Sequence, residues 1–165
     1  MNVTRAVEIK ASASTLWRIL AEEYDQVGEW TTQIEASSPN PDLPQGEGRV
    51  CVAPGFGDIK ETITYFDEKT REFSYEAEIS SFPFFVKEMG NSWRVEPKGN
   101  NRAVVHMNLK GRLLPVFAQI MGPIMRRQLA KSADTILSEL KYYAETGKIH
   151  PDKLVQLSKG QAALA

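Results

Sequence analysis

Glu61 is the acidic residue whose position in the sequence points most directly to chemistry. If residues 54–57 form a hairpin loop, Val50 faces Glu61 across the strand pair. If residues 68–70 form the next turn, Ala77 faces Glu61 from the other side. Both pairings place a carboxylate on an apolar face, where burial costs several kcal/mol unless the group is paired, hydrated or protonated. Glu61 is therefore a candidate polar anchor for a ligand, or a general acid or base.

Two structural explanations of Glu61 stay open beside the functional one. A β-bulge could turn its side chain outward, or a buried arginine could neutralise it without a functional role. The small side chain of Ala77 opposite favours an open space at this point.

Aromatic and sulfur-containing side chains share the apolar strand faces. The second hairpin places Phe73 opposite Tyr65. Asn91 lies on the same strand face as Trp93, where it would either add a polar group to the interior or mark the end of the strand. Buried aromatic residues are more often plain core than ligand contacts. The strand residues that we expect to contact a ligand are Glu61, Tyr65, Tyr75, Ala77, Trp93 and Met107.

Other chemistries have little support. His106 and His150 have no second obvious metal ligand nearby, so we expect no metal site. Cys51 and Arg49 are expected on the same outer face of their strand, and no histidine is placed to activate the thiol. Gly55-Phe56-Gly57 lacks the third glycine and the following helix of a nucleotide-binding loop. No cofactor is expected.

The order of elements is nearly all strand, followed by one long helix. Alternation predicts a strand over residues 2–10, after which Ser12 or Ser14 can cap a helix to about residue 24, with a second short helix or turn to Trp30. The density of prolines and glycines predicts a loop over 37–48. The remaining strands, separated by short turns, are predicted at 48–53, 58–66, 72–80, 87–96 and 102–111.

Residues 113–145 are predicted to be helical, with two apolar stripes that are out of phase across Gly122-Pro123. A kink or break at the proline would reconcile them, so we expect two helical pieces. The second would clamp the sheet and the first would act as an adjustable lid. Gly147 is a plausible C-cap of the helix. The lid residues expected over the ligand are Phe117, Ile120, Met121 and Met125.

Composition narrows the class of protein. The 165 residues fit one domain, predicted at 1–147, with a loosely held tail at 148–165. The net charge of −1, without a basic block, argues against a nucleic-acid partner. One cysteine excludes an intramolecular disulfide, and neither a secretory signal nor a membrane-spanning run is visible, so a cytoplasmic location is the simplest expectation. The oligomeric state is not indicated.

Five segments, in order and spacing, resemble the START-like superfamily, also called SRPBCC, and particularly its polyketide cyclase/dehydrase-like branch. The resemblance covers roughly residues 3–145. It implies an α+β helix-grip fold, in which a curved antiparallel sheet of about six to seven strands wraps a long C-terminal helix and two short helices follow strand 1. The segments that carry it are 11–17, 24–30, 61–67, 73–77 and 82–83.

The resemblance implies an apolar cavity between the sheet and the C-terminal helix, but no single activity. Our first hypothesis is a carrier or sensor that binds a lipid, polyketide or aromatic metabolite, with Glu61 as polar anchor. The second is a cyclase or dehydratase in which Glu61 acts as general acid or base and Tyr75 or Tyr65 polarises a carbonyl. The third is a partner-binding module with a vestigial cavity. Whether the protein is an enzyme stays open at this point.

Overall fold

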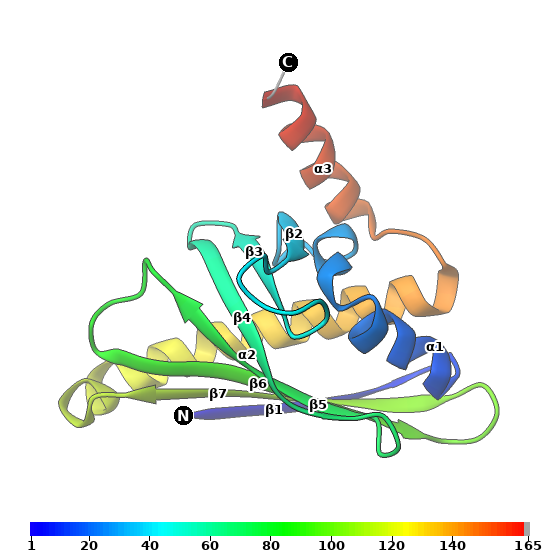
Figure 1. The fold of residues 1–165 in the computed structure, drawn as a ribbon, viewed down its shortest axis with the longest axis horizontal. Helices are drawn as coiled ribbons and strands as arrows, with labels where there is room; N and C mark the ends of the chain where they lie inside the picture. Colours follow the sequence, from blue (N-terminus) through cyan, green and yellow to red (C-terminus); the bar gives the residue numbers. More distant parts are fainter. Residues whose placement is uncertain (164–165) are drawn as a thin grey trace.

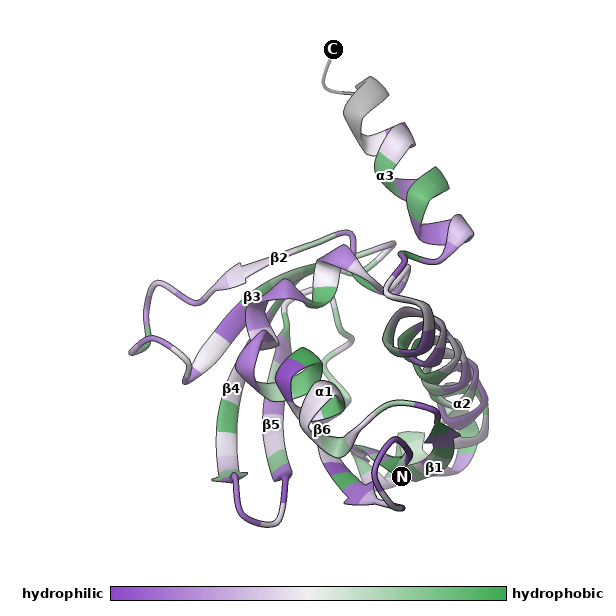
Figure 2. Cartoon of the chain, turned by 90° about the vertical axis from the view of Figure 1, so that its right-hand side faces the viewer, coloured by the Kyte–Doolittle hydropathy of each residue, from purple (hydrophilic) through white to green (hydrophobic). Residues whose placement is uncertain are grey.

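Seven strands form one antiparallel sheet, in the spatial order β1-β7-β6-β5-β4-β3-β2. The computed structural model describes the backbone of residues 1–163 and the side chains as far as Gly160. Seen end-on in Figure 2, the strands form an arc and a long helix lies across its open side. The strands are β1 (Asn2–Ile9), β2 (Ala36–Pro39), β3 (Gly48–Ala53), β4 (Gly57–Asp67), β5 (Glu72–Ile79), β6 (Val86–Pro97) and β7 (Ala103–Leu113).

Short helical segments follow β1, and two longer helices end the described chain (Figure 1). Ser12 caps the first short helix after β1 by accepting a hydrogen bond from the backbone N–H of Thr15 at 3.1 Å. The predicted fold class, an α+β helix-grip, is confirmed. The segments are α1 (Ala13–Trp17), the π-helical η1 (Arg18–Glu22), the 3₁₀-helical η2 (Tyr24–Glu29), α2 (Pro115–Thr146) and α3 (Pro151–Ala163).

The concave face of the sheet carries the core. Alternate residues of the strands point inward, so that Val105 and Met107 of β7 are buried against Leu16 and Trp17 of α1 and Leu140 of α2 within one apolar cluster. The second half of α2 closes this cluster, whereas the first half extends past it along β1 and β7.

The prediction that α2 divides at Gly122-Pro123 is wrong, because one helix runs from Pro115 to Thr146 with Pro123 inside it. Proline disfavours the helical conformation of the preceding residue partly through a clash with its Cβ, and Gly122 has none. The carbonyl of Gln119, which loses its donor at Pro123, lies on an exposed turn where water can reach it. Gly147 ends α2 in the left-handed conformation, with φ of 67°, as predicted.

The predicted register of the β3–β4 hairpin is wrong by one residue. Ala53 pairs with Gly57, so the loop has three residues rather than four, and Arg49 instead of Val50 lies opposite Glu61. The N–H of Phe56 donates to the carbonyl of Ala53 at 3.1 Å, and Gly55 in between has φ of 77°, as the third residue of a type II turn requires. Gly57, which pairs with Ala53, is also left-handed, with φ of 72°. A one-residue slip exchanges the faces of a strand, so Arg49 points into the core.

Two further strand predictions are corrected. Within the predicted loop at 37–48, residues 36–39 form the edge strand β2, which tolerates Pro39 because an edge needs fewer hydrogen bonds. The pairing of Glu61 with Ala77 is confirmed, but a bulge after Ile63 places Phe66, not Tyr65, opposite Phe73.

Helix α3 is joined to the body through its first turns. Lys153 is buried and donates from Nζ to the carbonyl of Ile34 at 2.6 Å, and Gln156 donates from Nε2 to the carbonyl of Thr32 at 2.9 Å. Beyond these contacts α3 projects from the molecule (Figures 1 and 2). The tail predicted at 148–165 therefore contains a helix over 151–163, and the domain boundary at 147 stays a prediction.

The segment that α3 contacts is also held from α2. Glu139 is buried, and its Oε2 accepts hydrogen bonds from Thr31 Oγ1 at 2.6 Å and from the N–H of Thr32 at 2.9 Å. Its Oε1 accepts from Thr32 Oγ1 at 2.6 Å. The loop between η2 and β2 is therefore fixed between the two C-terminal helices.

Candidate functional site

A buried polar cluster lies on the concave face where β3 and β4 pair. Glu61 Oε2 accepts hydrogen bonds from Arg49 Nε at 2.7 Å and from the Tyr24 hydroxyl at 2.8 Å. Arg49 also donates from Nη1 to the carbonyl of Tyr24. Of the two structural explanations left open by the sequence, the structure therefore contains the second, a buried arginine that neutralises Glu61.

Aromatic rings enclose the ion pair. The guanidinium carbon of Arg49 lies 3.9 Å from the ring centroid of Tyr24 and 5.5 Å from that of Tyr75, a cation–π arrangement. Burial tends to lower the pKa of Arg49, but Glu61, together with smaller contributions from Tyr24, Cys51 and Tyr75, outweighs it, so the pKa is raised. Burial raises the pKa of the Tyr24 and Tyr75 hydroxyls, so both stay protonated and able to donate at neutral pH.

Cys51 lies beside this cluster, on the same inner face of β3 as Arg49, because the one-residue change of register exchanges the two predicted faces of the strand. It is fully buried rather than on the outer face. Burial raises the pKa of its thiol from 9.0 to about 12, so it is protonated and unreactive at neutral pH.

Tyr75 and Asn91 form a second polar point that is less completely satisfied. They lie opposite each other on β5 and β6, and Asn91 Nδ2 donates to the Tyr75 hydroxyl at 3.4 Å. Asn91 is 2% exposed, and its Oδ1 has no hydrogen-bond partner among the described residues. A buried amide oxygen without a donor is costly, so a ligand or water donor is expected to reach it.

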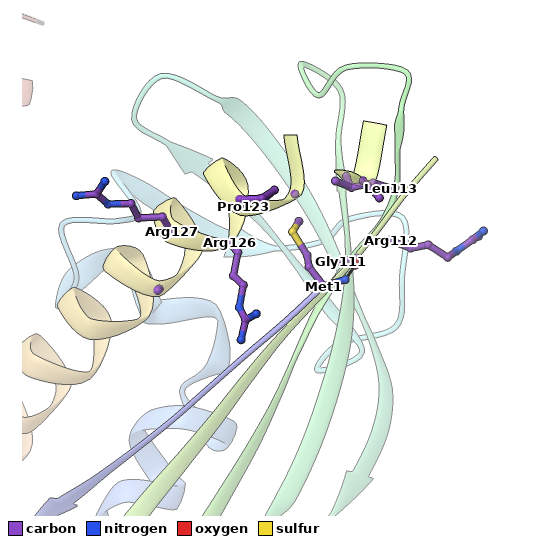
Figure 3. Close-up of a pocket in the computed structure, with 10 residues that line it drawn as sticks. Met1, Gly111, Arg112, Leu113, Pro123, Arg126 and Arg127 are labelled. Atoms are coloured by element: carbon purple, nitrogen blue, oxygen red, sulfur yellow. Dashed lines mark hydrogen bonds between the residues drawn. The ribbon is translucent and has the colours of Figure 1, made fainter. Parts of the chain in front are cut away.

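A pocket lies between the first half of α2, the end of β7 and the start of β1 (Figure 3). Its volume is about 720 Å³, within the range of small-molecule sites. In Figure 3 Arg126 reaches from α2 toward the strands, whereas Arg127 and Arg112 point away. The lining residues are Met1, Gly111, Arg112, Leu113, Ala118, Gly122, Pro123, Arg126, Arg127 and Ala130.

Two methionines separate this pocket from the Tyr75–Asn91 pair. A Cβ on Gly111 would lie 2.8 Å from Met1 Cε and 2.8 Å from Met89 Sδ, so both side chains cover Gly111. Met89 and Asn91 are alternate residues on the buried face of β6. Unbranched methionine side chains rearrange readily, so a ligand that displaced them would come close to Asn91.

Gly122 and Arg126 decide the shape of the pocket from the helix side. Gly122 is buried, yet a Cβ at this position would meet no atom within 4 Å, because it would point into open space. Arg126 also lines a second pocket of about 430 Å³ along the edge strand β1, so its guanidinium stands between the two spaces. It is the cation best placed to meet an acidic group in either one.

The predicted contact residues fall into separate places. Glu61, Ala77 and Tyr75 gather around the ion pair, and Trp93 and Met107 are packed in the core. The bulge leaves Tyr65 half exposed, which no longer fits the inner face. None of the predicted residues lines the pocket of about 720 Å³, although Tyr75 lines another of about 320 Å³, and their role in binding stays a prediction.

The predicted lid residues lie on different sides of α2. Phe117 stacks on Phe85 with ring centroids 4.6 Å apart, and Met121 and Met125 are partly buried. Ile120 points away from the sheet and is mostly exposed. Besides Arg126 and Arg127, the residues that α2 presents to the pocket are the smaller Ala118, Gly122, Pro123 and Ala130, whereas the predicted lid residues lie elsewhere on the helix.

Sequence reasoning missed Arg49, Tyr24 and Arg126. Arg49 could have been found by placing Pro54-Gly55 at the centre of a type II turn that Phe56 closes, which leaves a three-residue loop. Tyr24 and Arg126 had no local signal, because their roles depend on how η2 and α2 pack on distant strands. Among residues 1–163, no group of three or more histidine, cysteine and acidic side chains is arranged to hold a metal ion. No helix in the same range is long and apolar enough to cross a membrane.

Comparisons with known proteins agree on the fold. A family model described as polyketide cyclase/dehydrase and lipid transport matches residues 1–145. No curated protein matches the chain in sequence.

Solved structures resemble the chain over most of its length at low sequence identity. A START superfamily protein from Mycobacterium smegmatis has a TM-score of 0.71 at 15% identity, covering 89% of this chain and 99% of its own. XoxI from Bacillus cereus has a TM-score of 0.71 at 19% identity, covering 90% and 99%. The di-domain ARO/CYC protein BexL of the BE-7585A biosynthetic pathway has a TM-score of 0.70 at 19% identity, covering 86% and 45%.

Proposed function

Because the chain belongs to the polyketide cyclase/dehydrase and lipid transport family, we propose that it binds a small hydrophobic ligand between the sheet and α2. The observation that carries this proposal is the pocket of about 720 Å³ beneath the first half of α2. Apolar walls from Leu113, Ala118 and Pro123 would hold the body of the ligand. The protein would act as a carrier or sensor.

Arg126 in the pocket and the Asn91–Tyr75 pair beyond Met1 and Met89 suggest an amphipathic ligand. Arg126 would pair with an acidic or strongly polar head group. Asn91 Oδ1 and the Tyr75 hydroxyl would meet a hydroxyl or carbonyl of a ligand long enough to displace Met1 and Met89. Glu61 would support this end indirectly, through the charge of Arg49 beside Tyr75.

Gly122→Leu tests the pocket, because its new side chain would extend into the open space. We expect the variant to bind the apolar anionic dye anilinonaphthalene sulfonate at least tenfold more weakly than the wild type, as a filled pocket excludes the dye. Gln128→Leu is the matched control, since it adds the same side chain to an exposed position of α2 outside the pocket lining.

Native mass spectrometry of the wild type and of Gly122→Leu would identify any co-purifying molecule. A lipid or aromatic metabolite retained by the wild type and by Gln128→Leu, but lost from Gly122→Leu, supports the proposal. Equal dye affinity of all three proteins would contradict it.

A second candidate is a cyclase or dehydratase in which Glu61 acts as general acid or base. The favouring observation is that both donors, Arg49 and Tyr24, bind Oε2, which leaves Oε1 for a substrate. Turnover of a poly-β-ketone thioester, lost in Glu61→Gln with dye affinity unchanged, would establish it. Equal turnover by both proteins would remove Glu61 from the mechanism.

A further inference from the structure

The start of α2 and the β5–β6 turn lie at the same end of the molecule (Figure 1), and both carry exposed large apolar side chains. Val116, Ile120 and Ile124 of α2 are 73%, 69% and 54% exposed, and Phe84 in the β5–β6 turn is 72% exposed. We call these four residues the apolar tip. Single exposed apolar residues are ordinary, but a contiguous group of this size marks an interaction site.

The apolar tip rests on a fixed base. The ring of Phe117 stacks on Phe85 at 4.6 Å and meets Phe84 edge-on at 5.4 Å between centroids. The N–H of Leu114 donates to the carbonyl of Phe85 at 2.8 Å. The β5–β6 turn and the start of α2 are therefore one unit, and the tip requires no rearrangement to be presented.

Along α2 the apolar residues are followed by basic ones on the same side. At about 100° per residue, Val116, Ile120 and Ile124 fall within about 80° of one another, and Arg127 and Lys131 continue the line. At about 1.5 Å per residue, the apolar part is about 12 Å long. This side is opposite the one that buries Gly122 and Ala133, so it faces outward.

The charge of this region differs from that of the whole chain. Between Leu109 and Ala133 there are five basic residues and no Asp or Glu, although the chain carries a net charge of −1. No ion pair among the described residues involves Arg126, Arg127 or Lys131, whereas Arg112 pairs with Glu88. Arg127 and Lys131 are therefore available to an external anionic surface, whereas Arg126 lines the pockets.

We propose that the apolar tip and the basic residues behind it dock the protein on a lipid bilayer that contains anionic lipids. The short apolar segment would enter the boundary between head groups and acyl chains, and Arg127 and Lys131 would lie at the level of the phosphates. Up to Ala133 the outward face has an apolar end, a basic continuation and no carboxylate, which is complementary to such a surface. The next acidic residue along α2, Asp134, is paired with Arg5.

The docking surface and the pocket are on opposite sides of the same helical segment. Gly122 and Pro123 line the pocket, while Ile120 and Ile124 point outward. Docking would therefore bring the pocket close to the bilayer. The docking proposal depends only on the outward surface of α2 and not on the pocket. Vesicle binding can therefore be absent while ligand binding is present, and ligand binding can be absent while vesicle binding is present.

Co-sedimentation with two kinds of vesicle tests the proposal. The wild type should bind vesicles of phosphatidylcholine with about one third phosphatidylglycerol, and bind pure phosphatidylcholine vesicles at least tenfold more weakly. Ile120→Asp should lose at least tenfold in binding to the anionic vesicles, because a carboxylate would enter the apolar boundary. Lys131→Gln should weaken binding about fivefold, and binding should fall with added salt.

Leu154→Asp is the matched control, since Leu154 is an exposed apolar residue on α3, away from the tip. It should bind anionic vesicles like the wild type, and circular dichroism should show all variants folded. The proposal is overturned if the wild type ignores anionic vesicles, or if Ile120→Asp binds them equally well. It is also overturned if the tip instead mediates self-association, so that Ile120→Asp converts an oligomer to a monomer without any vesicle binding by either form.

Discussion

Arg49 determines what the buried carboxylate of Glu61 can do. A buried pair of this kind adds little net stability compared with apolar residues, but the loss of one partner leaves an uncompensated charge. The Arg49–Glu61 pair is therefore a point of high mutational sensitivity, whether or not a ligand approaches it.

We predict that Arg49→Met lowers the free energy of unfolding by about 3–5 kcal/mol, because Glu61 would be buried without its cation. The double variant Arg49→Met/Glu61→Leu should recover most of that loss, since both charges are then absent. Urea unfolding of the wild type, the two single variants and the double variant measures this coupling. A cost below about 1 kcal/mol for Arg49→Met would mean that water or another group already neutralises Glu61.

The position of Glu61 on the inner face could be predicted from its two hairpins, but the identity of its partner could not. A change of one residue in loop length exchanged Val50 for Arg49, and the alternation of strand residues carried no information about which loop would form. The turn residues Pro54 and Gly55 held the missing information.

At the scale of elements, α2 shows how a helix can accommodate a proline. Gly122 removes the Cβ that would clash, and the unpaired carbonyl lies on an exposed turn. The two apolar stripes seen in the sequence are explained without a break: one belongs to the core and the other is left exposed. Periodicity alone could not distinguish a stripe that faces the sheet from one that faces outward.

We predict that Pro123→Ala raises the free energy of unfolding by about 1–2 kcal/mol, because it restores a helical hydrogen bond at some cost in unfolded-state entropy. Pro151→Ala is the control, since Pro151 is the first residue of α3, where proline is well tolerated. Thermal unfolding of both variants compares the two positions. A lower melting temperature for Pro123→Ala would show that the proline is not a weak point of α2.

At the scale of the whole molecule, the two C-terminal helices are tied to the first third of the chain. Glu139 of α2 and Lys153 of α3 hold the loop between η2 and β2 from two sides. Six of the seven strands and the long closing helix could be predicted because alternation and turn residues are local signals. The anchoring of α3 could not, because Lys153 reads as a surface residue until its long-range partners are known.

Lys153 should make stability depend on pH. Burial lowers its pKa, with Glu139 and Glu35 opposing the shift, so the unfolded state binds the proton more tightly than the folded state. The wild type should therefore gain stability as pH rises from the lowered folded pKa toward 10.5, the ordinary lysine value. Lys153→Met should be less stable at neutral pH by about 1–3 kcal/mol, because the carbonyl of Ile34 loses its donor.

The difference in unfolding free energy between the wild type and Lys153→Met, measured from neutral to alkaline pH, isolates this effect from other titrating groups. We expect the difference to widen as pH rises. A difference that narrows would indicate that Lys153 is stabilised in its charged form.

The burial of Cys51 has a practical consequence for site-specific labelling. It is the chain's only cysteine, and its thiol is both inaccessible and protonated at neutral pH. Maleimide reagents should therefore leave the folded wild type unmodified. A cysteine introduced at an exposed position such as Ile120→Cys would be the single reactive thiol, and an environment-sensitive fluorophore could be attached there without first replacing Cys51.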